Sequence, residues 1–212
     1  MKKIALLLML LISTYVCAQN SNTTFGIKSG INLSKYSPEI YVGVQRLADY
    51  QFNLGFYVGG FSNIEISEKV KIQPELLLYT QGTKTVVDEV NIIDERRNIS
   101  NSRFEMNITE YVISLPVTLQ YFISEKINLE GGLQLGFIVD RKDKIIEDPF
   151  SNINQEETTP TDFDKFDFGI NIGVGYNLSE SLRLNSRYFI GILERDDIIK
   201  SRVLSFGLEY KL

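Results

Sequence analysis

The segment 111–140 alternates apolar and polar residues along two long arms, and this alternation limits the folds open to the chain. In the first arm every second residue is apolar or aromatic: Tyr111, Ile113, Leu115, Val117, Leu119, Tyr121 and Ile123. After a short polar turn, the second arm keeps the same period from Ile127 to Val139. A period of two places alternate side chains on opposite faces of a strand, so the segment predicts a β-hairpin.

The length and chemistry of the two arms indicate where this hairpin lies. Each arm alternates for about a dozen residues, whereas strands of soluble proteins usually have roughly 5–6. A tilted strand crosses a bilayer with about 9–11 residues. The apolar face has no charge, and the opposite face is small and polar, which suits a transmembrane barrel with lipid outside. A long hairpin in a soluble sandwich or lipocalin-like barrel is the alternative from this segment alone.

The first residues have the organisation of a secretory signal peptide. Two lysines precede an apolar run at 4–12, and small-residue positions end at Ala18. We therefore expect residues 1–18 to be a cleaved signal peptide and residues 19–212 to be one barrel domain. The alternatives are an uncleaved anchor or a lipoprotein signal on Cys17, although the preceding Val16 does not fit a lipobox.

The composition of the mature chain excludes several classes of chemistry. The single cysteine leaves with the signal peptide and there is no histidine, so we expect no disulfide, no histidine-based triad and no His or Cys metal site. The signal peptide contains two lysines and no acids, so the mature net charge is (22 − 2) − 27 = −7. This acidity gives no support for nucleic-acid binding. No other apolar run is long enough for a transmembrane helix.

The rest of the chain repeats the alternation of the central hairpin. Period-two segments occur at 25–33, 52–59, 70–81, 111–123, 127–140, 166–178, 182–192 and 203–212. The connections after the second, fourth and sixth segments are brief and polar, whereas 36–51, 82–107, 141–162 and 194–201 are expected to be longer loops, with 82–107 alternatively a hairpin extension. Short turns on one rim and long loops on the other are typical of outer-membrane barrels. The chain therefore predicts an all-β fold, an eight-stranded antiparallel up-and-down transmembrane β-barrel with periplasmic short turns.

The alternation also assigns the two faces of the predicted wall. The predicted lipid-facing residues are Leu115, Val117, Leu119, Leu133, Leu135, Ile170, Ile172, Val174, Leu184, Ile190, Phe206 and Leu208. Three outward tyrosines near the short turns are candidates for an interfacial aromatic belt: Tyr121, Tyr176 and Tyr210. Ordinary β-propensity is the alternative explanation for these tyrosines.

The inward face carries the charges that we expect to form a structural cluster in the barrel interior. These are Lys28, Lys71, Glu75, Glu110, Glu130, Arg183, Arg187, Glu209 and Lys211. An eight-stranded barrel is just wide enough for side chains to fill it, and buried charges must be paired. We therefore expect a paired polar plug, with Arg183 and Glu209 in contact, and treat an ion or proton path as the alternative.

Two other groups of acidic residues are candidate sites. Glu75 and Glu110 could act as an acid–base pair, but nothing nearby supplies a nucleophile or a substrate cleft. The loop acids lack the spacing of a calcium loop and are expected to be solvated: Asp143, Glu147, Asp148, Glu156, Glu157 and Asp162. The sequence thus predicts no catalytic residues, no cofactor and no metal site.

Four segments, taken in order, resemble the PorT-like outer-membrane β-barrel family. They are IQPELLLYTQGTK at 72–84, the hairpin at 111–142, FDFGINIGVGYNLSESLRLNSRYFIGI at 166–192 and VLSFGLEYKL at 203–212. The resemblance covers essentially the whole mature chain and implies an outer-membrane barrel of a Gram-negative bacterium. The founding member of that family is linked to a protein secretion system. The shared positions form the barrel and not a functional site, so that role does not transfer.

These observations lead to one expected function and one alternative. We expect an integral outer-membrane protein that is not an enzyme and has a structural or interaction role through long extracellular loops. The alternative is a small passive pore or an accessory component of an outer-membrane transport or secretion system. Expected partners are outer-membrane lipid and the barrel-assembly machinery, with no nucleic acid. The sequence does not identify a specific protein partner.

Overall fold

The fold is described from a computed structural model that covers residues 22–42, 45–93, 99–148, 157–160, 162–196 and 198–212. The predicted signal peptide at 1–18 lies outside the described residues. Within these ranges, no helix has the length and apolar character needed to cross a membrane.

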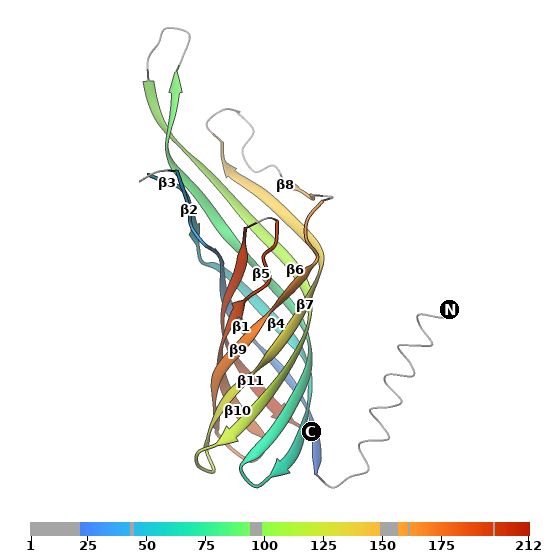
Figure 1. The fold of residues 1–212 in the computed structure, drawn as a ribbon. Helices are drawn as coiled ribbons and strands as arrows, with labels where there is room; N and C mark the ends of the chain where they lie inside the picture. Colours follow the sequence, from blue (N-terminus) through green and yellow to red (C-terminus); the bar gives the residue numbers. More distant parts are fainter. Residues whose placement is uncertain (1–21, 43–44, 94–98, 149–156, 161, 197) are drawn as a thin grey trace, which may run out of the picture.

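Eight long strands of the described chain form a closed antiparallel ring (Figure 1). They are β1 (Thr23–Ser37), β4 (Asn53–Ser67), β5 (Val70–Ile93), β6 (Ile99–Phe122), β7 (Ile127–Glu147), β9 (Phe166–Asn177), β10 (Leu182–Gly191) and β11 (Lys200–Lys211). Each strand pairs with the next long strand in the chain, and β1 pairs with β11 to close the ring. This confirms the predicted eight-stranded antiparallel up-and-down barrel.

The two faces of the wall follow the alternation in the sequence. Inward side chains are buried, and the expected lipid-facing residues are exposed on the outer wall, except for Ile190, which is half-buried. Exposed apolar side chains all around a wall are unusual for a soluble protein and are the normal state of a wall in lipid. Tyr121, Tyr176 and Tyr210 are also exposed on the outer wall, and their role as an interfacial belt stays a prediction.

Three segments expected to be loops contain strands. β1 continues to Ser37, and β2 (Ile40–Val42) and β3 (Gln45–Gln51) occupy most of the expected loop 36–51. β3 then pairs with the upper part of β5, where Tyr50 lies opposite Thr85. The segment 82–107 is a hairpin extension, because β5 and β6 continue to pair up to Ile93 and Ile99. β7 extends to Glu147 and pairs there with β8 (Glu157–Thr158).

Because only some strands are extended, one side of the barrel rises above the other (Figure 1). β5, β6 and β7 continue well beyond the ends of β9, β10 and β11, away from the short turns. The short turns and the C-terminus lie at the opposite end. By the rule for outer-membrane barrels, the short-turn end faces the periplasm and the extended strands stand outside the cell.

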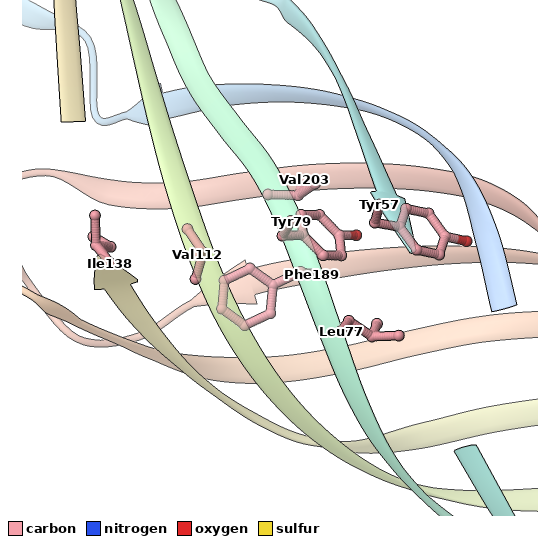
Figure 2. Packing of buried hydrophobic residues seen from close by; sticks show 7 residues of the cluster. All are labelled: Tyr57, Leu77, Tyr79, Val112, Ile138, Phe189 and Val203. Carbon is pink, nitrogen blue, oxygen red and sulfur yellow. The ribbon is translucent and has the colours of Figure 1, made fainter. Parts of the chain in front are cut away.

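A group of buried apolar side chains packs together inside the barrel (Figure 2). The buried members are Tyr57, Leu77, Tyr79, Val112, Ile138, Phe189 and Val203. Tyr57 and Tyr79 stack with ring centroids 5.1 Å apart and an interplanar angle of 7°. A second group lies nearer the extracellular mouth and consists of Tyr36, Tyr50, Ile108 and Ile199. The rings of Tyr36 and Tyr50 pack edge to face. Below we call the first group the apolar layer.

Candidate functional site

Six charged side chains meet inside the barrel on the periplasmic side of the apolar layer. We call them the periplasmic cluster: Lys28 (β1), Glu75 (β5), Glu130 (β7), Arg183 and Arg187 (β10) and Glu209 (β11). All six occupy inward positions of the alternation, and all are buried. Antiparallel register brings some of them to the same height, because Glu209 lies opposite Lys28 on one side and Arg183 on the other.

Ion pairs link the periplasmic cluster into one network. Arg187 Nη2 lies 2.9 Å from Glu75 Oε1 and 2.7 Å from Glu130 Oε2, so one guanidinium joins two carboxylates. Lys28 Nζ lies 3.2 Å from Glu75 Oε1 and 2.9 Å from Glu209 Oε1. The contact expected between Arg183 Nη1 and Glu209 Oε2 is 3.3 Å. Three cations thus face three carboxylates, and the buried group is electrically neutral, as burial of charge requires.

Amide side chains complete the coordination of these charges. Gln73 Nε2 donates to Glu75 Oε1 at 2.9 Å and to Glu209 Oε1 at 3.2 Å. Arg183 donates to Asn177 Oδ1 at 2.9 Å and to Gln120 Oε1 at 3.0 Å. Buried charges are tolerated when their remaining donors and acceptors are also satisfied. The inward amides of the alternating strands therefore belong to the same network as the charges.

A second polar group lies on the extracellular side of the apolar layer. We call it the extracellular cluster: Tyr36, Gln81, Glu110, Asp167, Arg195 and Ser201. Arg195 binds Glu110 with both terminal nitrogens, at 2.8 Å from Nη1 to Oε1 and 3.2 Å from Nη2 to Oε2. The Tyr36 hydroxyl donates to Glu110 Oε1 at 2.6 Å. Arg195 comes from the loop between β10 and β11, so this loop reaches into the lumen.

The charge state of Arg195 fits its position. Burial disfavours the charged guanidinium and lowers its pKa. The electrostatic attraction of Glu110, Tyr36 and Asp167 raises the pKa by more, so the pKa of Arg195 lies above its ordinary value. Gln81 Nε2 donates to Glu110 Oε2 and to Asp167 Oδ2, both at 3.1 Å, and so bridges the two carboxylates. The extracellular cluster therefore closes the lumen at a second level.

The structure divides the nine expected interior charges into three groups. Six form the periplasmic cluster, and Glu110 belongs to the extracellular cluster, with Gln81 as its cross-strand partner. Lys71 and Lys211 lie at the periplasmic rim and are only half-buried, and Lys71 Nζ binds Glu65 Oε2 at 2.9 Å. Expecting a single cluster was therefore wrong, because the apolar layer separates Glu75 from Glu110 along β5 and β6.

Of the extracellular cluster, only Glu110 is among the interior side chains expected from the sequence. Asp167 occupies an inward position of the segment 166–178, where a buried carboxylate needs a cation as its partner. Arg195 lies in a charged segment with no period, so nothing in the alternation marked it as internal. Tyr36 fell in the expected loop 36–51.

The apolar layer fills the space between the two clusters. An interior cavity of about 10 Å³ lies between Lys28, Tyr57, Tyr79 and Arg187, which is room for about one water. Tyr57 donates to Asn185 Oδ1 at 3.4 Å, and the hydroxyls of Tyr79 and Ser205 are hydrogen-bonded. The lumen is therefore packed with side chains at three successive levels.

The loop acids that the structure describes do not gather into a group of three or more. Asp143 binds Arg141, with Nε of the arginine 2.9 Å from Oδ1, and Glu156 lies outside the described residues. Across the described ranges, no group of three or more potential ligand side chains is placed to hold a metal ion.

Comparisons with known proteins agree with this architecture. Ail of Yersinia pestis, crystallised with the heparin analogue sucrose octasulfate, aligns with 90% of this chain and 99% of its own, at 16% identity and a TM-score of 0.50. Neisserial surface protein A aligns with 91% of this chain and 100% of its own, at 12% identity and a TM-score of 0.47. At 16% identity the likeness to Ail concerns the fold alone, and no curated protein matches the sequence.

A family model provides the stronger relationship. The model described as "Outer membrane protein beta-barrel domain" matches residues 17–194, which is most of the chain. The match includes seven of the eight wall strands and the lumen residues that they carry. The chain therefore belongs to the outer membrane protein beta-barrel domain family and is an integral protein of the outer membrane.

Proposed function

We propose that this protein is a closed, non-conducting barrel without enzymatic activity, which anchors an extracellular structural or interaction surface in the outer membrane. The observation that carries the proposal is the filled lumen. The periplasmic cluster, the apolar layer and the extracellular cluster each occupy its cross-section. A passive pore needs a continuous aqueous path, and these three packed levels argue against that alternative.

The extracellular strands supply the proposed interaction surface. β3, β5, β6, β7 and β8 pair in this order above the barrel, so the extension is an open sheet and not separate loops. An open sheet has edges, and exposed edges can bind an extended segment of another protein through main-chain hydrogen bonds. The short strands β2 and β8 lie at the two edges of this sheet.

The positions of the acidic side chains support a non-enzymatic role. The two carboxylates of the candidate acid–base pair, Glu75 and Glu110, lie on opposite sides of the apolar layer. Each is bound by arginine and is buried away from any substrate. Their geometry supports a stabilising role.

Three finer assignments belong to the same proposal. The four matching segments support a PorT-like branch of the family, without a link to secretion. The apolar run at 4–12 supports a cleaved signal peptide at 1–18. The barrel-assembly machinery is the expected partner during insertion, because a membrane barrel must close its ring of hydrogen bonds as it enters lipid.

Single-channel recording in planar bilayers tests the closed lumen. We expect the wild-type protein to give no steady unitary current. The matched variant Tyr57→Ala/Tyr79→Ala removes two rings from the apolar layer, and it should also give no steady current because the two polar clusters still occupy the cross-section. Heat-modifiable migration on a gel verifies that both proteins are folded. A reproducible wild-type channel would refute the proposal.

A further inference from the structure

Two basic side chains lie next to each other on the outer wall, on the strands that close the barrel. Lys35 of β1 is directly opposite Arg202 of β11 in the register. Both lie between buried inward neighbours, Ser34 and Tyr36 on one strand and Ser201 and Val203 on the other, so both point away from the lumen. Side chains that are directly opposite on one face have Cβ atoms about 4.5–5.5 Å apart, and like charges there repel.

Neither basic side chain has an acidic partner within the described residues. The Lys35 ammonium lies 5.3 Å from the centroid of the Phe52 ring. Arg202 Nη1 donates to the carbonyl oxygens of Gly191 at 2.8 Å and Ser201 at 3.2 Å, which fixes the guanidinium and leaves its other donors available. Lys200, the next outward residue of β11 toward the extracellular side, does have an acidic partner, because its Nζ lies 3.0 Å from Glu194 Oε1.

The pair lies where the apolar outward positions of β11 end on the extracellular side. On the periplasmic side of the pair, the outward positions of β11 are apolar or aromatic from Leu204 through Phe206 to Tyr210. With Leu212, which is also exposed, the stretch has nine residues, the lower end of the roughly 9–11 that a tilted strand needs to cross the hydrocarbon region. The basic pair is therefore at the level of the outer-leaflet headgroups, where cationic side chains bind anionic lipid.

A shallow groove on the outer wall ends just below the pair. It has a volume of about 450 Å³, and its lining includes Ile172, Val174, Ser186, Tyr188 and Leu204. The groove is hollow at Ser186 because this side chain is smaller than the neighbouring lining side chains. Leu204 lies opposite both Tyr188 and Leu33, and Arg202 is the next outward residue of the same strand. The groove crosses β7, β9 and β10 and reaches β11 at Leu204, so its β11 end is next to the basic pair.

We propose that this surface binds a phosphorylated glycolipid of the outer leaflet. The phosphate lies between Lys35 and Arg202, and an acyl chain lies in the groove below. The phosphate neutralises two like charges that have no counter-charge in the described chain. An anion within reach of both converts their repulsion into two charge-assisted contacts. The apolar groove requires that the anion be attached to a lipid, and this excludes a soluble phosphate as the natural ligand.

Native mass spectrometry of the full-length protein in detergent tests this site, with diphosphorylated lipid A as the probe. Each basic residue at a membrane surface contributes about fivefold to the affinity for an anionic lipid. We therefore expect Lys35→Gln/Arg202→Gln, which removes two such residues, to weaken binding about 30-fold. Lys35→Arg keeps the charge and should bind as the wild type does. The control Lys69→Gln/Lys126→Gln removes two exposed charges from the periplasmic rim and should leave binding unchanged. Heat-modifiable migration verifies folding of every variant.

Two further probes separate the lipid from its phosphate. Dephosphorylated lipid A should bind the wild type as weakly as lipid A binds the double variant. Inorganic phosphate at millimolar concentration should not displace lipid A. The proposal is overturned if the double variant keeps wild-type affinity, if the periplasmic control loses as much, if dephosphorylation has no effect, or if inorganic phosphate displaces the lipid.

Discussion

Replacing Arg187 with methionine should destabilise the barrel more than any change at its rims. Arg187 is the cation that joins Glu75 and Glu130 in the periplasmic cluster. Without it, Glu75 keeps Lys28 at 3.2 Å, whereas Glu130 keeps only the amides of Gln120 and Asn128, at 3.2 and 3.3 Å. The variant therefore buries one carboxylate without a counter-charge. Loss of one partner of a buried ion pair typically costs about 3–5 kcal/mol.

The double variant Arg187→Met/Glu130→Gln separates the charge effect from lost packing. It leaves two cations and two carboxylates in the cluster, so neutrality returns. We expect it to cost less than Arg187→Met alone, with an interaction energy of about 1–3 kcal/mol in a double-mutant cycle. The measurement is the free energy of unfolding by urea in lipid vesicles, followed by circular dichroism because the chain has no tryptophan.

A rim ion pair gives the matched control. Lys71 binds Glu65 at 2.9 Å, and the side chains are 22% and 44% exposed. Lys71→Met should cost less than about 1 kcal/mol, because solvent screens an exposed pair. The reasoning fails if Arg187→Met costs as little as this control, or if the two changes in the cycle are strictly additive. Either result would mean that water, not the protein, solvates the periplasmic cluster.

Three further changes test the wall, the apolar layer and the extracellular cluster. Ile172→Arg, near the middle of the lipid face, should cost about 2–4 kcal/mol in the same assay, against about 0–1 for Ile123→Arg beside a periplasmic turn. Gly207→Ala places a Cβ 2.0 Å from the Tyr57 hydroxyl and should cost about 1–3 kcal/mol, partly recovered by adding Tyr57→Phe. Arg195→Gln should accelerate amide hydrogen exchange in the β10–β11 loop, and unchanged exchange would show that the loop is held by its backbone alone.

The walls of the barrel were predictable because lipid and lumen impose opposite requirements on alternate residues. From Tyr111 to Ile123, for example, every outward side chain must be apolar, so the strand is visible as a period of two. Outside the membrane this requirement ends, because neither face of the sheet meets lipid. The upper parts of β5 and β6 mix apolar and charged residues, and main-chain pairing that the alternation cannot reveal holds them together.

The candidate site was predictable to the same extent and for the same reason. Inward charges on regular strands, such as Lys28 and Glu209, could be assigned to the lumen from their position in the alternation. Their division into two clusters could not, because it depends on which heights of the barrel are filled by large rings. Arg195 lies outside any period, and its place in the lumen follows from the path of a loop.

The composition of the periplasmic cluster bears on how the barrel closes. Its charges come from β1, β5, β7, β10 and β11, so no single hairpin can neutralise them. β1 and β11 are the first and last strands of the wall, and Lys28 Nζ lies 2.9 Å from Glu209 Oε1 across their seam. In an open sheet these two side chains would not be paired with each other. An unpaired charge that faces lipid has a high free-energy cost. The network is completed only when the seam forms, and it therefore favours the closed ring over every partly paired sheet.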